Sequence, residues 1–72
     1  MDMSVWVIVE FAYDEPEVVM VVEELETATG WYPQAEWRRA GETWAATLPE
    51  GVGGMDPEAT RVMLVKAPLV MS

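Results

Sequence analysis

Carboxylates are the only abundant side chains in this chain that could take part in catalysis. The sequence has 13 acidic residues against four Lys and Arg residues, and it contains neither His nor Cys. Without an imidazole or a thiol, the usual partner that activates Ser4, Ser72 or a threonine as a nucleophile is missing. Glu23 and Glu24 are adjacent, so on a helix their side chains diverge and cannot share a cleft that separates their pKa values. We therefore expect no enzyme activity and no catalytic residue.

Two short motifs resemble ligand-binding loops but lack the residues or the spacing that such loops need to bind their ligands. The Gly-rich segment 51–54 is not followed by the Lys and the Ser or Thr of a phosphate-binding loop, and Asp56 and Glu58 would repel a phosphate. The carboxylates between Asp14 and Glu17 could hold Ca²⁺ weakly, but they lack the spacing of an EF-hand loop. Zinc sites normally use Cys and His, which are absent. The sequence predicts no cofactor and no metal site.

The negative charge is concentrated in the first half of the chain. Residues 1–37 contain nine acidic residues and no Lys or Arg, whereas residues 38–72 contain four of each sign, and the net charge is −9. Such a field repels nucleic acids and anionic lipids and attracts basic proteins. We therefore expect a basic protein partner and no nucleic acid. The alternative is that the acidity only keeps a chain rich in apolar residues in solution.

The length allows one domain, spanning residues 1–72, with a small core. A core of this size supplies about 3–5 kcal/mol of net stability, and no disulfide can add to it. Self-association or a partner is the remaining means of support. Asp2 stands where a secretory signal would be basic, Glu10 interrupts the apolar stretch that follows, and no apolar run reaches the ~20 residues of a membrane span. We expect a cytoplasmic protein that does not bind membranes.

Two elements are predicted in the first half of the chain. Residues 4–12 are rich in β-branched and aromatic residues and are apolar on both faces, which indicates a central strand. Residues 14–30 are predicted as a helix, with Asp14 as its cap, Glu17 completing a capping box, Pro16 in the first turn and Gly30 at its end. An apolar stripe at helical spacing would face a sheet: Val18, Val21, Val22, Leu25 and Ala28.

The Trp-rich stretch 31–48 is predicted as a β-hairpin with its turn at Ala40-Gly41. A two- or four-residue loop would pair Arg39 with Glu42 and Trp37 with Trp44, whereas a three-residue bulged loop would place the two tryptophans on opposite faces. We favour the first register, because it gathers the apolar side chains on one face. That face comprises Ala35, Trp37, Trp44, Ala46 and Leu48.

The last part of the chain allows two interpretations. A short helix from Pro57 to about Lys66 could precede a strand at 69–71, or residues 62–65 could form a buried strand. With the helix, the order is β-α-β-β-(α)-β. This order predicts a small α+β two-layer sandwich, with one antiparallel sheet covered by one main helix and a ferredoxin-like arrangement as the simplest form.

In that arrangement, the first strand lies beside the strand that contains Trp44, and one sheet face is left uncovered. Trp6 and Ile8 would be exposed there, with the small side chains of Thr43, Ala45 and Thr47 around them. Trp6 is then the functional candidate among the tryptophans, while Trp37 and Trp44 belong to the core.

The main hypothesis is a small acidic interaction module that binds a basic partner protein and modulates or inhibits it. Interface cores are enriched in aromatic residues and Met, with charged residues at the rim. The predicted partner-binding residues combine both kinds: Trp6, Ile8, Val19, Met20, Glu23, Glu24, Glu26, Thr43 and Ala45. In its sharpest version the protein is a DNA mimic that occupies a basic groove, as small phage- or plasmid-encoded inhibitors do.

A homo-oligomeric structural or small-ligand-binding module is the alternative. In that case the open sheet face would pair with a second copy and bury Trp6 and Ile8. An acidic subunit of an enzyme is retained only as a third, formal alternative.

Overall fold

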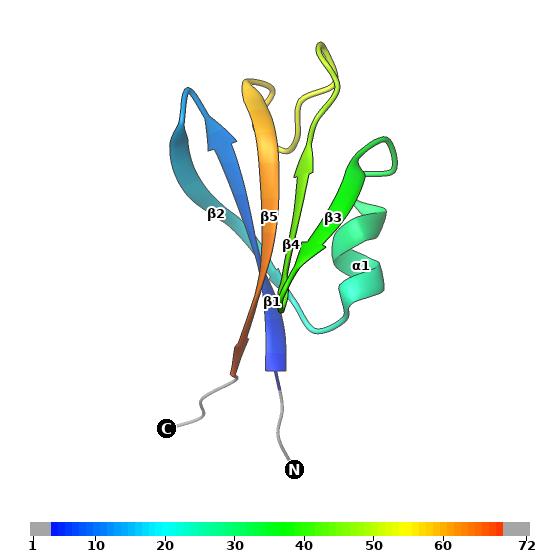
Figure 1. The fold of residues 1–72 in the computed structure, drawn as a ribbon. Helices are drawn as coiled ribbons and strands as arrows, with labels where there is room; N and C mark the ends of the chain where they lie inside the picture. Colours follow the sequence, from blue (N-terminus) through cyan, green and yellow to red (C-terminus); the bar gives the residue numbers. More distant parts are fainter. Residues whose placement is uncertain (1–3, 69–72) are drawn as a thin grey trace.

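A single antiparallel sheet of five strands and one short helix make up the fold. The structure is a computed structural model that describes residues 4–68 (Figure 1). The elements are β1 (Ser4–Ala12), β2 (Glu15–Val22), α1 (Leu25–Gly30), β3 (Glu36–Ala40), β4 (Thr43–Thr47) and β5 (Ala59–Pro68). The sheet order is β2-β1-β5-β4-β3, and every neighbouring pair is antiparallel. The predicted combination of an antiparallel sheet with a helix is therefore present, but the element order is β-β-α-β-β-β.

The predicted helix over residues 14–30 is wrong, because most of that segment is strand β2. Tyr13 and Asp14 have φ of 54° and 62°. Two central residues with positive φ are typical of the type I′ turn that joins the strands of a tight hairpin. Four β-branched valines follow in β2, and Pro16 is tolerated because β2 lies at the sheet edge. Only Leu25–Gly30 is helical, and it ends at Gly30 as predicted.

The hairpin of β3 and β4 keeps the predicted faces but not the predicted pairs. Trp37 lies opposite Ala46 and Arg39 lies opposite Trp44, so the turn is Gly41-Glu42 rather than Ala40-Gly41. Gly41 has φ of 64°, a conformation that suits glycine. The register differs from the predicted one by two residues, and a shift of two leaves every side chain on the same face. Trp37 and Trp44 therefore share one face, but they do not form a direct cross-strand pair.

The helix predicted from Pro57 to Lys66 is also wrong, and the alternative of a buried strand at residues 62–65 is confirmed within β5. β5 lies at the centre of the sheet and separates β1 from β4. The predicted adjacency of β1 to the strand that contains Trp44 is therefore wrong as well. The strand predicted at residues 69–71 lies outside the described residues.

The hydrophobic core lies on the sheet face that was predicted to be open. Ile8, Val62 and Leu64 have no exposed surface, and Ala28 of α1 and Tyr32 pack with them from outside the sheet. Trp6 is partly buried against the same cluster, so the prediction that Trp6 and Ile8 are exposed on an open face is wrong. The alternation of β1 was predicted correctly, but the covering segments lie on its other side.

The opposite sheet face carries the remaining apolar residues of the central and edge strands, and we call it the valine face. Cross-strand pairing places its members together: Val5, Val7, Val9 and Phe11 of β1, Val18 and Val21 of β2, and Met63 and Val65 of β5. Thr43, Ala45 and Thr47 of β4 continue the same face. α1 contacts β1 and β2 from the core side of the sheet and so leaves the valine face uncovered.

Candidate functional site

A buried carboxylate fixes the loop that leads into β5. Glu10 of β1 is 1% exposed, and it is the only buried polar or charged residue among those described. Its carboxylate accepts hydrogen bonds from the Tyr32 hydroxyl and from the backbone N–H groups of Met55 and Asp56, at 2.8 and 2.9 Å. A Cβ added at Gly54 would lie 2.6 Å from the Glu10 Cδ, so only glycine allows this approach. The loop is therefore held against the end of β1.

Tyr32 links this carboxylate to the rest of the core. Burial and the hydrogen bond to Glu10 raise the pKa of the Tyr32 hydroxyl well above its usual range, which keeps it protonated as a donor. Its ring meets that of Trp37 edge to face, with the centroids 6.0 Å apart. The cluster of Glu10, Tyr32 and the loop amides is fully hydrogen-bonded, which indicates a positioning role rather than a reactive one.

The fixed loop brings two acidic residues next to those of the β1–β2 turn. A hollow of about 310 Å³ opens there, and we call it the acidic hollow. It is lined by Ala12, Tyr13, Glu15, Pro16, Glu17, Asp56 and Glu58. The Tyr13 hydroxyl donates to Glu58 Oε2 at 2.8 Å, and the Glu58 N–H donates to Asp56 Oδ1 at 2.9 Å. Residues from two segments far apart in the chain, 12–17 and 56–58, thus form one surface.

The acidic hollow is strongly negative. The hydrogen bond to Glu58, followed by the charges of Glu58 and Asp56, raises the pKa of the Tyr13 hydroxyl. Arg61 pairs with the adjacent Asp14: its Nη2 lies 3.4 Å from Asp14 Oδ1, in the only ion pair within residues 4–68. The side chain of Tyr13 is 78% exposed, so its ring is free for contact.

Carboxylates around an exposed aromatic ring suit an organic cation better than a metal ion. A guanidinium or ammonium group can donate to several carboxylates and stack on the ring. No cluster of three or more metal-ligating side chains is arranged to hold a metal ion within residues 4–68.

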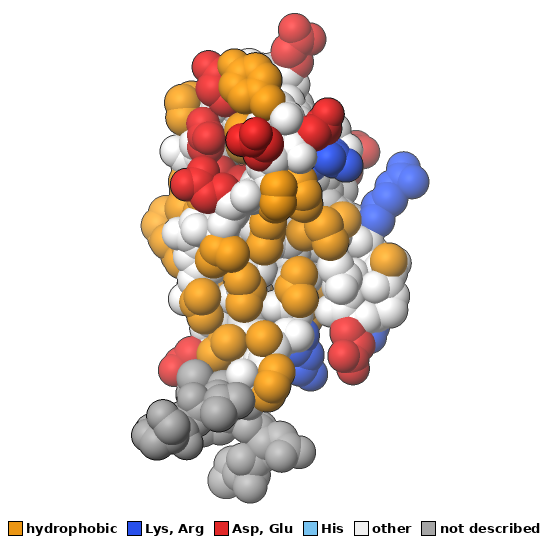
Figure 2. All heavy atoms as spheres, turned by 90° about the vertical axis from the view of Figure 1, so that its left-hand side faces the viewer, with side chains coloured by type: hydrophobic (Ala, Val, Ile, Leu, Met, Phe, Trp, Pro, Cys, Tyr) orange, Lys and Arg blue, Asp and Glu red, His pale blue; other side chains and the backbone are white. Residues whose placement is uncertain are grey.

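The valine face is the second candidate surface. Val18, Val21 and Val65 are 61%, 54% and 36% exposed. Figure 2, which shows the side of the molecule away from α1, has hydrophobic side chains down the middle and acidic side chains gathered at the end far from the termini. Contiguous apolar surface of this kind marks interaction sites in globular proteins.

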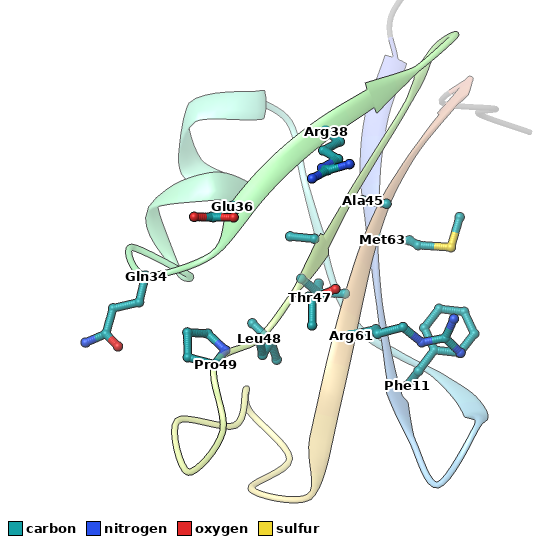
Figure 3. Close-up of a pocket in the computed structure, with 12 residues that line it drawn as sticks. Phe11, Gln34, Glu36, Arg38, Ala45, Thr47, Leu48, Pro49, Arg61 and Met63 are labelled. Carbon is teal, nitrogen blue, oxygen red and sulfur yellow. The ribbon is translucent and has the colours of Figure 1, made fainter.

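A broad hollow of about 670 Å³ lies on the same face, over β4 and its neighbours. The small side chains of Ala45 and Thr47 form part of its lining, between Arg38 of β3 and Met63 of β5 (Figure 3). Arg61 lies at its edge, with its guanidinium carbon 4.8 Å from the centroid of the Phe11 ring. We call this feature the β4 hollow.

The predicted partner-binding residues do not form one surface. Ile8 is fully buried, and Trp6, Val19 and Met20 are partly buried against the core. Glu23, Glu24 and Glu26 are exposed around the start of α1, whereas Thr43 and Ala45 lie on the valine face.

The acidic hollow was missed because Glu17 was interpreted as part of the capping box of a helix over residues 14–30. The available signal was the run of valines after Tyr13-Asp14, which fits a hairpin as well as a helix. Asp56 and Glu58 lie next to the β1–β2 turn because their loop is bonded to Glu10, which is more than 40 residues away in the chain. The residues near either segment do not indicate this contact.

No helix within residues 4–68 is long and apolar enough to cross a membrane. Comparisons with protein-family models, with curated proteins and with solved structures found no match, so the candidate sites depend on the geometry and chemistry of this chain alone.

Proposed function

We propose that this protein is an acidic interaction module that binds an Arg- or Lys-bearing segment of a partner protein at the acidic hollow. The observation that supports the proposal is the convergence of Glu15, Glu17, Asp56 and Glu58 around the exposed ring of Tyr13. By occupying basic side chains, the module would block a partner's own anionic ligand, and in this way it would modulate or inhibit that partner.

The contributions of individual charges indicate what kind of binding to expect. An exposed ion pair contributes about 0.2–1 kcal/mol, so affinity has to come from several carboxylates acting together and from contact with the Tyr13 ring. Arg should be preferred to Lys, because its planar guanidinium stacks on an aromatic ring and can bond two carboxylate oxygens at once. Binding should weaken as salt is added, since the charges are exposed.

Titration with short peptides, followed by NMR chemical shifts of the backbone amides, tests this proposal. An oligo-arginine peptide should shift the amides that surround the hollow, an oligo-lysine peptide should do so more weakly, and an oligo-glutamate peptide should not. These amides belong to Tyr13, Asp14, Glu15, Glu17, Asp56 and Glu58. The double variant Glu15→Gln, Glu58→Gln should reduce oligo-arginine affinity several-fold at low salt.

The matched control is the double variant Glu23→Gln, Glu24→Gln, which removes two exposed charges near the start of α1. It changes the net charge by the same amount but leaves the acidic hollow intact, so it should bind nearly as well as the parent chain. An equal loss in both double variants would show that binding follows net charge alone and would contradict the proposal. A greater loss of affinity in the control variant would also contradict the proposal, and it would indicate that the peptide binds at the predicted residues Glu23, Glu24 and Glu26.

A further inference from the structure

The valine face consists of a ridge and a hollow on opposite sides of β5. Val18 and Val21 of β2 are among the most exposed large hydrophobic residues described, and with Val7 and Val9 opposite them they form the ridge. The β4 hollow lies on the other side, where Ala45 and Thr47 leave space. The sheet order places β2 and β1 on one side of β5, and β4 and β3 on the other.

We propose that the valine face is buried against a second copy of this chain, about a two-fold axis that runs along β5. Rotation about that axis places the ridge of one copy over the β4 hollow of the other, and the reverse contact follows by symmetry. Such isologous packing requires a surface that complements itself, and a ridge and a hollow on either side of a central strand meet that requirement.

The size of the face suits a stable interface. Five strands spaced ~4.8 Å apart, and on average about seven residues long at ~3.3 Å each, give a projected area of roughly 550 Å². Side-chain relief raises the accessible area above its projection, towards the ~800 Å² that each partner contributes to a standard interface. The face also lacks a covering layer, and a second sheet packed at ~10 Å would supply one.

The charges on this face favour a second copy over a basic partner. Strand alternation leaves only Glu36, Arg38 and Arg61 as charged side chains on it, which gives it a net charge of +1 in a chain of net charge −9. Two acidic molecules can therefore approach here with less repulsion than elsewhere. Glu15 and Glu17 alternate to the other side of β2, since Glu17 pairs with the inward-facing Glu10, so the proposed dimer leaves the acidic hollow open.

Sedimentation equilibrium over the micromolar range tests for the dimer. The parent chain should sediment as a dimer. Val21→Lys should raise the dimer dissociation constant about a hundredfold, because the two-fold axis places the substituted residue of both copies in the interface and each copy raises the constant about tenfold. Val52→Lys is the matched control, because Val52 is 47% exposed and lies in the loop between β4 and β5. This control should sediment like the parent chain.

Cross-linking tests the position of the axis without disturbing the ridge. The chain has no Cys, so Val65→Cys introduces a single thiol on β5, 36% exposed at the proposed axis. A short bismaleimide should link two copies of this variant and should not link two copies of Val52→Cys. A parent chain that stays monomeric would overturn the proposal. A dimer that tolerates Val21→Lys and is not linked through Val65→Cys would also overturn it, because its interface would then lie elsewhere.

Discussion

Replacing Tyr32 by Phe tests whether the bond to Glu10 supports the fold. The ring and its edge contact with Trp37 are retained, and only the hydroxyl donor to the buried carboxylate is lost. A hydrogen bond to a charged group contributes about 1.5–3 kcal/mol, and Glu10 keeps its bonds to the Met55 and Asp56 amides. We therefore expect the free energy of unfolding to fall by about 2 kcal/mol, which in a domain of this size lowers Tm by roughly 8–16 °C.

Urea denaturation followed by Trp fluorescence measures this loss, because the chain contains four tryptophans. Tyr13→Phe is the matched control: it removes a similar hydroxyl that donates to Glu58 at the surface, and it should cost less than about 0.5 kcal/mol. A double-mutant cycle of Tyr32→Phe with Glu10→Gln should show a coupling energy of about 1 kcal/mol or more, since the two groups touch. A Tyr32→Phe loss no greater than that of Tyr13→Phe, or strict additivity in the cycle, would refute the assigned role of this bond.

Three further predictions concern pH and two glycines. Because the pKa of the Tyr32 hydroxyl is raised in the folded state, the unfolded chain loses the hydroxyl proton at a lower pH than the folded chain does. The free energy of unfolding should therefore fall as pH rises above about 10. In thermal melts at a series of pH values, Tyr32→Phe should reduce this fall more than Tyr13→Phe does. Gly54→Ala should displace the Glu10 carboxylate and cost about 1–3 kcal/mol, with faster hydrogen exchange at the two loop amides that bond it; exchange at the parent rate would contradict this. Gly41→Ala should cost about 1–2 kcal/mol in a thermal melt, since φ of 64° is unfavourable for a residue with a Cβ, and a neutral effect would count against the assigned turn.

Patterns that depend on near neighbours predicted part of this fold correctly. The alternation in Ser4–Ala12 identified a strand and separated Val7 and Val9 from Ile8 and Glu10. The division of residues 35–48 into an apolar and a polar face placed Trp37 and Trp44 together. Both results follow because a strand places alternate side chains on opposite faces whatever its partner is.

The segment after Asp14 was mispredicted because its pattern satisfies two periods. Val18, Val21, Val22 and Leu25 recur at helical spacing, but the valine-rich run suits a strand equally well. The deciding feature is the turn at Tyr13-Asp14, whose residues both have positive φ although neither is glycine. Since Tyr seldom adopts this conformation, a tight hairpin at this position could not be predicted from the residue types.

The side of the sheet that is covered also could not be predicted from the sequence. It is set by contacts between distant residues, above all by Tyr32 and the loop amides around Glu10. Once the predicted helix was placed on the Val5–Phe11 side of β1, Trp6 and Ile8 were assigned to the open face. The predicted partner-binding residues depended on the same error. The acidic first half of the chain contributes Glu15 and Glu17 to the acidic hollow, and Asp56 and Glu58 come from the second half.

The central position of β5 has a consequence for how the chain folds. Two-residue turns join β1 to β2 and β3 to β4, so each of these hairpins can form as soon as its strands are synthesised. In contrast, β1 and β5 pair through residues that are 47 positions apart at Ala12–Ala59 and 64 positions apart at Ser4–Pro68. Pairing over such separations is slow, because a long loop has to close first. Until β5 docks, β1 and β4 each present an unpaired edge that can recruit another chain. We therefore expect the yield of refolding to depend on protein concentration and to be set by how quickly this one strand inserts between the two hairpins.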